Sequence, residues 1–215
     1  KDQQTVFTFK EIREAIQAGV ISKKSVEEWQ QDYSKLVHDK IAPEMVKAMK
    51  AGAKNQNQHK GIDIGYKFDA DHWAVSDWLE KHTAELVTNC TRVQKDAIQS
   101  MIDLGIRKHM GTDELARFIR PCIGLTKPQT QAAMKYYENI KEELTKKHPR
   151  TSPEKIEKMA RDKQMKYAEK RLRERAVTIA QTERAFAYEY GRYQHIKNLV
   201  DQGILPPQDK KWSAT

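Results

Sequence analysis

The stretch RAVTIAQTERAFAYEYGR, residues 175–192, decides the fold because an acidic residue interrupts its apolar face. On a helix, apolar residues recur there at steps of four and three and form one stripe, made of Leu172, Ala176, Ile179, Phe186 and Tyr190. Glu183 falls on that stripe, and no residue one turn away carries positive charge. An ionised carboxylate that faces a core costs several kcal/mol unless it is paired. We therefore expect a basic or donor group from another segment to reach Glu183. In the alternative, a slight rotation of the helix leaves Glu183 at the edge of the stripe, in water.

The same helix resembles the signature of the Mu F-like head morphogenesis family, which are minor capsid proteins of tailed phages. The matching positions in this chain are Arg175, Ala176, Ile179, Ala180, Thr182, Glu183, Ala187 and Gly191. Two further stretches are similar to family motifs, Gly124-Leu125-Thr126 with Gln129 and Tyr136, and Lys211-Trp212 with Ala214-Thr215. The likeness covers roughly residues 65–215.

Two positions depart from the family pattern. Gln181 stands where an arginine is usual, and the sequence ends at Thr215, where family members continue into a polar segment that contains histidine. That further segment could supply the natural partner of Glu183.

The composition favours an all-α protein with much exposed surface. Mean hydropathy is -0.85, 32% of the 215 residues are charged and only 38% are hydrophobic, which suits an elongated helical assembly better than a compact enzyme. Cys90 and Cys122 lie in no C-x-x-C spacing, so no disulfide framework is indicated. No apolar run is long enough to span a bilayer, and the sequence begins without a signal-peptide pattern.

The positive charge is concentrated in one segment. Residues 141–175 carry a net charge of +6 out of +9 for the chain, which predicts attraction to a polyanion such as DNA or to an acidic partner. The candidate binding residues are Lys155, Lys158, Arg161, Lys163, Lys166, Lys170, Arg171 and Arg173. The alternative is a solvated helix face with internal ion pairs, for which Glu154–Lys158 and Glu169–Arg173 have the required spacing. Charge alone leaves both interpretations open.

Helix boundaries are indicated along most of the chain. Thr8 with Glu11, Ser25 with Glu28, and Thr126 with Gln129 fit capping boxes. Residues 51–61 are small and polar without periodicity, so we expect an N-terminal helical segment at 1–50, a linker at 51–61 and a Mu F-like helical domain at 62–215. Residues 62–68 alternate weakly like a short extended segment, and two helices are expected over 71–88 and 89–107. A long C-terminal helix runs from Pro153 to about Gln202 and either projects as an arm or breaks near 170–175.

Sites for catalysis or metal binding are not indicated. The sequence carries no P-loop, G-x-G-x-x-G, G-x-S-x-G or H-E-x-x-H motif, and His72 and His82 are too far apart on one helix to chelate an ion. Trp29 and Trp73 lie on apolar faces and are expected in the core, whereas Trp212 is expected to be exposed or docked. We expect no enzymatic activity and no cofactor.

The resemblance implies a phage minor head protein inside the capsid near the portal. Its expected partners are the portal protein, other capsid proteins and double-stranded DNA bound without sequence preference, and it would reside in the host cytoplasm during assembly. The signature residues would hold the helical core: Arg175, Ile179, Thr182, Glu183, Gly191 and Trp212. In the alternative, the chain is a helical scaffold or adaptor that binds a protein partner and not DNA.

Overall fold

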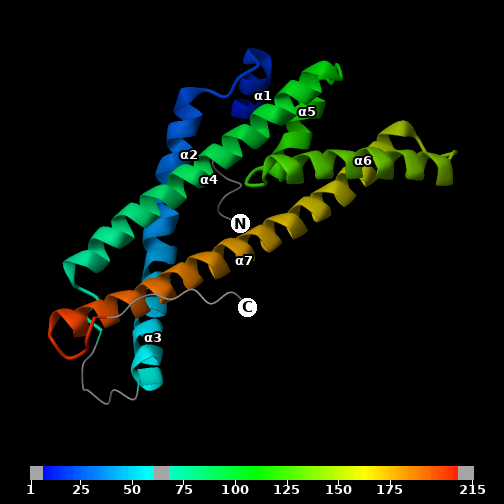
Figure 1. The fold of residues 1–215 in the computed structure, drawn as a ribbon. Coiled ribbons are helices and arrows are strands. Elements are labelled where there is room, and N and C mark those ends of the chain that lie inside the picture. The colour runs from blue at the N-terminus through cyan, green and yellow to red at the C-terminus, as the bar shows by residue number, and fades with distance from the viewer. Residues whose placement is uncertain (1–6, 61–67, 208–215) are drawn as a thin grey trace. The chain divides into compact units, whose positions relative to one another are not determined.

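The computed structural model describes residues 7–60 and 68–207, without the side chains of 57–60. The described residues are helical and contain no strand, which confirms the predicted all-α class and the long C-terminal helix (Figure 1). The elements are α1 (Phe9–Ala18), α2 (Lys23–Leu36), the π-helical turn η2 (Val37–Ile41), α3 (Ala42–Lys60), α4 (Trp73–Arg107), α5 (Thr112–Ile119), the 3-10 turn η3 (Arg120–Cys122), α6 (Lys127–Lys147) and α7 (Pro153–Asp201).

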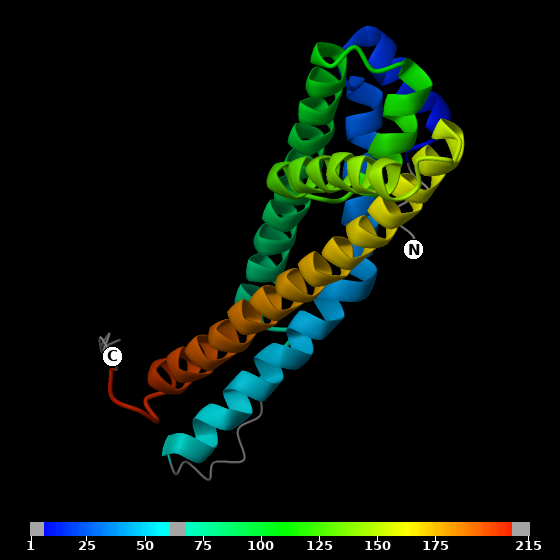
Figure 2. The ribbon, with the colours of Figure 1, turned by 90° about the vertical axis from the view of Figure 1, so that its right-hand side faces the viewer.

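α7 is one uninterrupted helix of 49 residues, so the predicted possibility of a break near 170–175 is wrong (Figure 2). The segment around that point consists of lysine, arginine, glutamate, leucine and alanine, all strong helix formers, and lacks proline and glycine. The helix stops beyond Asp201, where Gly203 adopts a φ of +71° that other residues rarely reach.

Two other helices are longer than the sequence patterns predict. α4 runs through 35 residues as one helix and not two, because Val87 and Thr91 are buried on either side of the expected break. Residues 51–60 belong to α3, so the prediction of a linker there is wrong. The propensity of alanine, lysine and glutamine continues that helix where the apolar period fades. Residue 61 and most of the expected extended segment at 62–68 lie outside the described residues.

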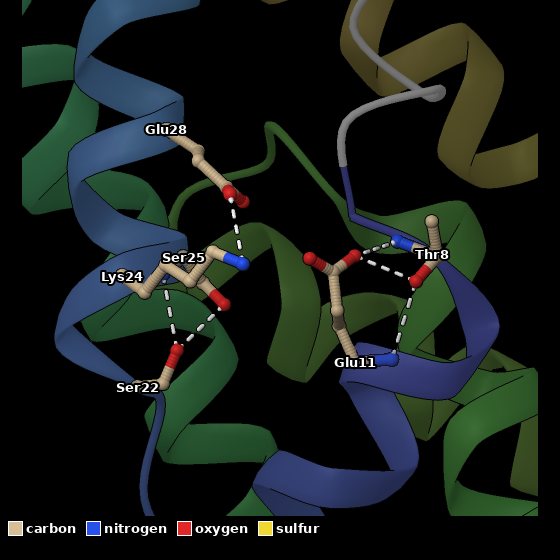
Figure 3. Close-up of polar contacts among 6 residues, drawn as sticks. All are labelled: Thr8, Glu11, Ser22, Lys24, Ser25 and Glu28. Atoms are coloured by element: carbon tan, nitrogen blue, oxygen red, sulfur yellow. Dashed lines mark hydrogen bonds and ion pairs between the residues drawn. The ribbon is translucent and has the colours of Figure 1, made fainter.

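Side-chain caps define where the first helices begin (Figure 3). Thr8 and Glu11 form the predicted capping box, with the Thr8 amide donating to Glu11 Oε2 at 2.7 Å. The predicted box at Ser25 is wrong, because the Ser25 amide instead donates to Ser22 Oγ at 3.0 Å. α2 consequently starts earlier, at Lys23. The box of Thr126 and Gln129 at the start of α6 is confirmed.

The chain forms two compact units, each built from two separate stretches of sequence, which differs from the predicted division. Unit 1 comprises residues 1–35 and 85–177, and unit 2 comprises residues 36–84 and 178–215. The core of unit 1 gathers around α5, where Leu115, Phe118 and Ile119 are fully or almost fully buried. α7 joins this core through buried Gln164, whose amide donates to the Phe118 carbonyl at 3.3 Å. α6 and the first turns of α7 lie side by side in both views (Figures 1 and 2).

Unit 2 is held by close contact between α3 and α7. A Cβ atom at Gly191 would lie 2.2 Å from the carbonyl oxygen of Met49, and one at Gly52 would lie 2.1 Å from that of Tyr188. Only glycine allows the two backbones to approach so closely, since any side chain would collide with main chain that cannot move aside. This confirms that Gly191 permits a close helix approach.

Candidate polyanion-binding face and its supporting helix

Glu183 is buried, with 9% of its surface exposed, and it has a partner from a distant segment. His82 on α4 places Nε2 2.5 Å from Glu183 Oε2, within unit 2. An ionised carboxylate only accepts hydrogen bonds, so the imidazole Nε2–H is the donor. The expectation of a donor from another segment is confirmed, and the alternative of Glu183 at a wet edge is wrong. Among the described residues, the partner is His82.

Aromatic rings hold the His82 imidazole in place. Trp78, one turn earlier on α4, stacks on it with centroids 4.4 Å apart, and Trp78 also stacks on Tyr190 of α7 at 4.7 Å. The Tyr190 hydroxyl donates to the Ala74 carbonyl at 2.7 Å, which fixes the far end of the stack. The hydrogen-bonded pair of His82 and Glu183 therefore sits in an aromatic frame between α4 and α7. Sequence reasoning considered His82 only as a metal ligand and missed this role, although the four-residue spacing of Trp78 and His82 was a signal.

The predicted apolar stripe of α7 differs from the buried one. Phe186 is 53% exposed and Ala176 is also exposed, so neither belongs to a core. The buried positions of this part of α7 instead recur every four residues, at Glu183, Ala187, Gly191, His195 and Leu199. The stripe that faces the neighbouring helices therefore consists largely of small and polar residues.

Apart from Gly191, the other signature residues are less buried than Glu183 where the structure describes them. Arg175 and Ile179 are half-buried, Thr182 is exposed, and Trp212 lies outside the described residues. Of the tryptophans expected in the core, Trp29 is buried as predicted, whereas Trp73 is 71% exposed. The prediction for Trp73 is wrong because α4 begins at this residue, so that no preceding turn of that helix covers it.

The basic segment of α7 belongs to unit 1 and has one buried and one exposed side. The buried positions recur every four residues, at Ile156, Ala160, Gln164 and Ala168. Six of the eight predicted binding residues are exposed and form what we call the basic face: Lys155, Lys158, Lys163, Lys166, Lys170 and Arg173. Asp162 and Glu169 are exposed beside them, so the face is mainly but not purely cationic.

Arg161 and Arg171, the other two predicted residues, are half-buried away from this face. Arg161 lies 3.3 Å from Glu157, and Arg171 lies 2.8 Å from Glu174 with its guanidinium 5.0 Å from the Tyr167 ring centroid. Both side chains are occupied by packing within unit 1. We therefore exclude them from the basic face.

Glu157 is the centre of the contacts that hold α7 against α6. It accepts from Lys141 at 2.6 Å and from the Tyr137 hydroxyl, in addition to Arg161. Burial by itself would raise the pKa of Glu157, but the hydrogen bonds from Lys141 and Tyr137 outweigh it and lower the pKa below its ordinary value. The carboxylate thus stays ionised and fixes the buried side of the helix that carries the basic face.

Ion pairing distinguishes the lysines of the basic face. Among the described residues, no carboxylate lies within 4.0 Å of the amino groups of Lys155, Lys158, Lys163 or Lys166, whereas Lys170 is 4.0 Å from Glu174. Arg173 donates to the Glu169 carbonyl oxygen at 3.4 Å and not to its carboxylate. The expected ladder of internal ion pairs is therefore not formed by Glu154–Lys158 or Glu169–Arg173. Four ammonium groups remain available to an external anion.

The part of the chain that the structure describes gives little support for a metal site, a reactive cysteine or a membrane-spanning helix. No group of three or more His, Cys, Asp or Glu there could hold a metal ion. Burial raises the pKa of the Cys122 thiol to about 12, which leaves it protonated and unreactive at neutral pH. Within the same residues, no helix is both long and apolar enough to cross a membrane.

Comparisons with protein-family models, with curated proteins and with solved structures give no match to this chain. The Mu F-like resemblance therefore stays a prediction carried by the residues quoted above.

Proposed function

We propose that this chain is a non-enzymatic helical protein that binds double-stranded DNA without reading its sequence, in the manner of Mu F-like minor head proteins. In that role it would act inside a phage capsid near the portal, in contact with the portal protein and other capsid proteins, after assembly in the host cytoplasm. The basic face of α7 would meet the DNA phosphates.

The observation that carries the proposal is a set of exposed lysines that form no ion pair with a described carboxylate. Lys155, Lys158, Lys163 and Lys166 are exposed, and no described carboxylate lies within ion-pair distance of any of them. A lysine already paired with glutamate must exchange that contact for a phosphate, and the exchange gains little. An unpaired lysine gains the full contact and releases counterions from the DNA.

Neutralising part of the basic face tests the proposal. The triple variant Lys158→Gln, Lys163→Gln and Lys166→Gln should bind a duplex of arbitrary sequence at least tenfold more weakly than the parent. The matched control is Lys10→Gln, Lys23→Gln and Lys24→Gln, which removes the same charge from the same unit. Each of these control lysines lies within 4 Å of a glutamate. If the two variants lose the same affinity for the duplex, the effect depends only on net charge, and the proposal is contradicted.

The alternative function, a helical adaptor that binds protein and not DNA, is favoured by a different observation. Phe186 and Tyr193 on α7 are 53% and 60% exposed although each contacts one ring of unit 2, so much of their apolar surface is open to a further protein. On this alternative, duplex binding by the parent is weak and does not change in the triple variant.

A further inference from the structure

The exposed aromatic residues of unit 2 belong to a regular row on α7. Ile179, Phe186, Tyr193 and Val200 recur every seven residues. Phe186 and Tyr193 are exposed by more than half, and the two ends of the row are half-buried. Helices that pair side by side repeat two apolar positions every seven residues, and this row supplies one such series. The row therefore has the form of a helix-docking surface.

Two charged residues lie symmetrically about Tyr193, one of the two exposed aromatic residues of the row. Glu189 precedes Tyr193 by four residues and Lys197 follows it by four, and both are exposed. Arg192 lies 3.0 Å from Oε1 of Glu189, and a carboxylate can accept a second donor in addition. Among the described residues, no carboxylate lies within ion-pair distance of Lys197. Opposite charges thus lie at equal distances on the two sides of Tyr193.

The placement of these two charges indicates which helix can bind to the row. A second copy of α7 that runs antiparallel, with the two-fold axis at Tyr193, places Glu189 opposite Lys197 of the partner subunit, and the reverse. The same register places Phe186 opposite Val200 of the partner subunit. A parallel copy would instead place each Glu189 against itself and would be repelled. The row is therefore complementary to its own antiparallel copy.

We propose that two copies of this chain associate through this row, antiparallel, with Tyr193 on the two-fold axis. The contact is isologous, since the same patch serves both subunits. It lies in unit 2 and uses no residue of the basic face in unit 1. Self-association and DNA binding can therefore fail independently.

Charge reversal with rescue tests the register. Sedimentation velocity of the full chain over a concentration series should show a monomer–dimer equilibrium that Glu189→Lys or Lys197→Glu weakens about tenfold. The double variant Glu189→Lys, Lys197→Glu should restore the parent affinity. The two residues are eight apart, about 12 Å along one helix, so rescue cannot arise within a single chain. A parent that stays monomeric up to about 0.1 mM, or a double variant as weak as the single ones, would overturn the proposal.

Cross-linking gives a second readout of the axis. Tyr193→Cys places a thiol opposite its own copy, so oxidation should give a covalent dimer on a non-reducing gel. Gln181→Cys is the matched control, since Gln181 is exposed on the same helix but about a third of a turn away from the row. The parent, with Cys90 and Cys122, sets the baseline. Equal dimer yields from the two cysteine variants would contradict the placement of the axis.

Discussion

His82 Nε2 lies 2.5 Å from Glu183 Oε2, and the two residues are 101 positions apart in the sequence. The pair joins the beginning of α4 to the second half of α7 within unit 2. The acidic residue on the conspicuous helix is thus a structural contact between helices, and nothing in its surroundings requires a catalytic role.

Replacing Glu183 separates loss of the hydrogen bond from loss of charge. Glu183→Gln keeps an acceptor for His82 and should lower the free energy of unfolding by about 1 kcal/mol, whereas Glu183→Leu leaves the half-buried imidazole donor without an acceptor and should cost roughly 2 kcal/mol. Urea unfolding followed by circular dichroism measures both.

The same substitutions at Glu169 provide the control, because this residue is exposed on the same helix. They should change stability by no more than about 0.5 kcal/mol. A Glu183→Leu variant as stable as the parent would show that the pair with His82 contributes nothing.

Gly191→Ala should destabilise unit 2. The added methyl group would lie 2.2 Å from the Met49 carbonyl oxygen, so the helices must separate, at a cost of about 1–3 kcal/mol. Gly111→Ala is the control, since nothing lies within 4 Å of that position and its φ is −63°. Thermal unfolding of the two variants checks the difference. A harmless Gly191→Ala would mean that α3 and α7 are not in backbone contact.

Glu157 should make unit 1 sensitive to acid. Its folded-state pKa is lowered, with the hydrogen bonds from Lys141 and Tyr137 outweighing burial. The carboxylate therefore contributes stability above its unfolded pKa of about 4.3, and this contribution is lost as the pH falls through the lower folded value.

Urea unfolding of the parent and of Glu157→Gln between pH 3 and 7 isolates this contribution. The difference in unfolding free energy should be largest at pH 7 and shrink below about pH 4.3. Glu142 and Glu143, whose pKa values are also lowered by lysine contacts, are present in both proteins and cancel. A difference independent of pH would show that the ionised form of Glu157 is not the stabilising one.

Local signals in the sequence predicted much of the helical structure. The three-residue spacing of threonine and glutamate or glutamine located the caps at Thr8 and Thr126, and the lack of a positive charge one turn from Glu183 indicated a partner from elsewhere. The identity of that partner could not be predicted, because pairing between distant segments depends on how the helices pack. The contact at Gly52 was missed for the same reason, since glycine in a polar stretch also fits a linker.

The basic face could have been predicted more accurately. Arg161 and Arg171 are as cationic as their neighbours, but their positions around the helix axis turn them toward the packed side of unit 1. Projecting the segment onto a helix separates them from Lys155 and Lys166. The ion pairs that occupy them join residues three or four apart on the same helix, a spacing that the sequence also shows.

Salt dependence of duplex binding tests the central claim most directly. If the basic face binds phosphates, the logarithm of the association constant should fall linearly with the logarithm of salt concentration. The slope of the triple variant Lys158→Gln, Lys163→Gln, Lys166→Gln should be shallower by up to roughly 2.7, at about 0.9 per lost phosphate contact. The Lys10, Lys23 and Lys24 control should keep the parent slope. An association constant that does not depend on salt concentration, or an equal slope in the parent and the triple variant, would contradict phosphate binding by the basic face.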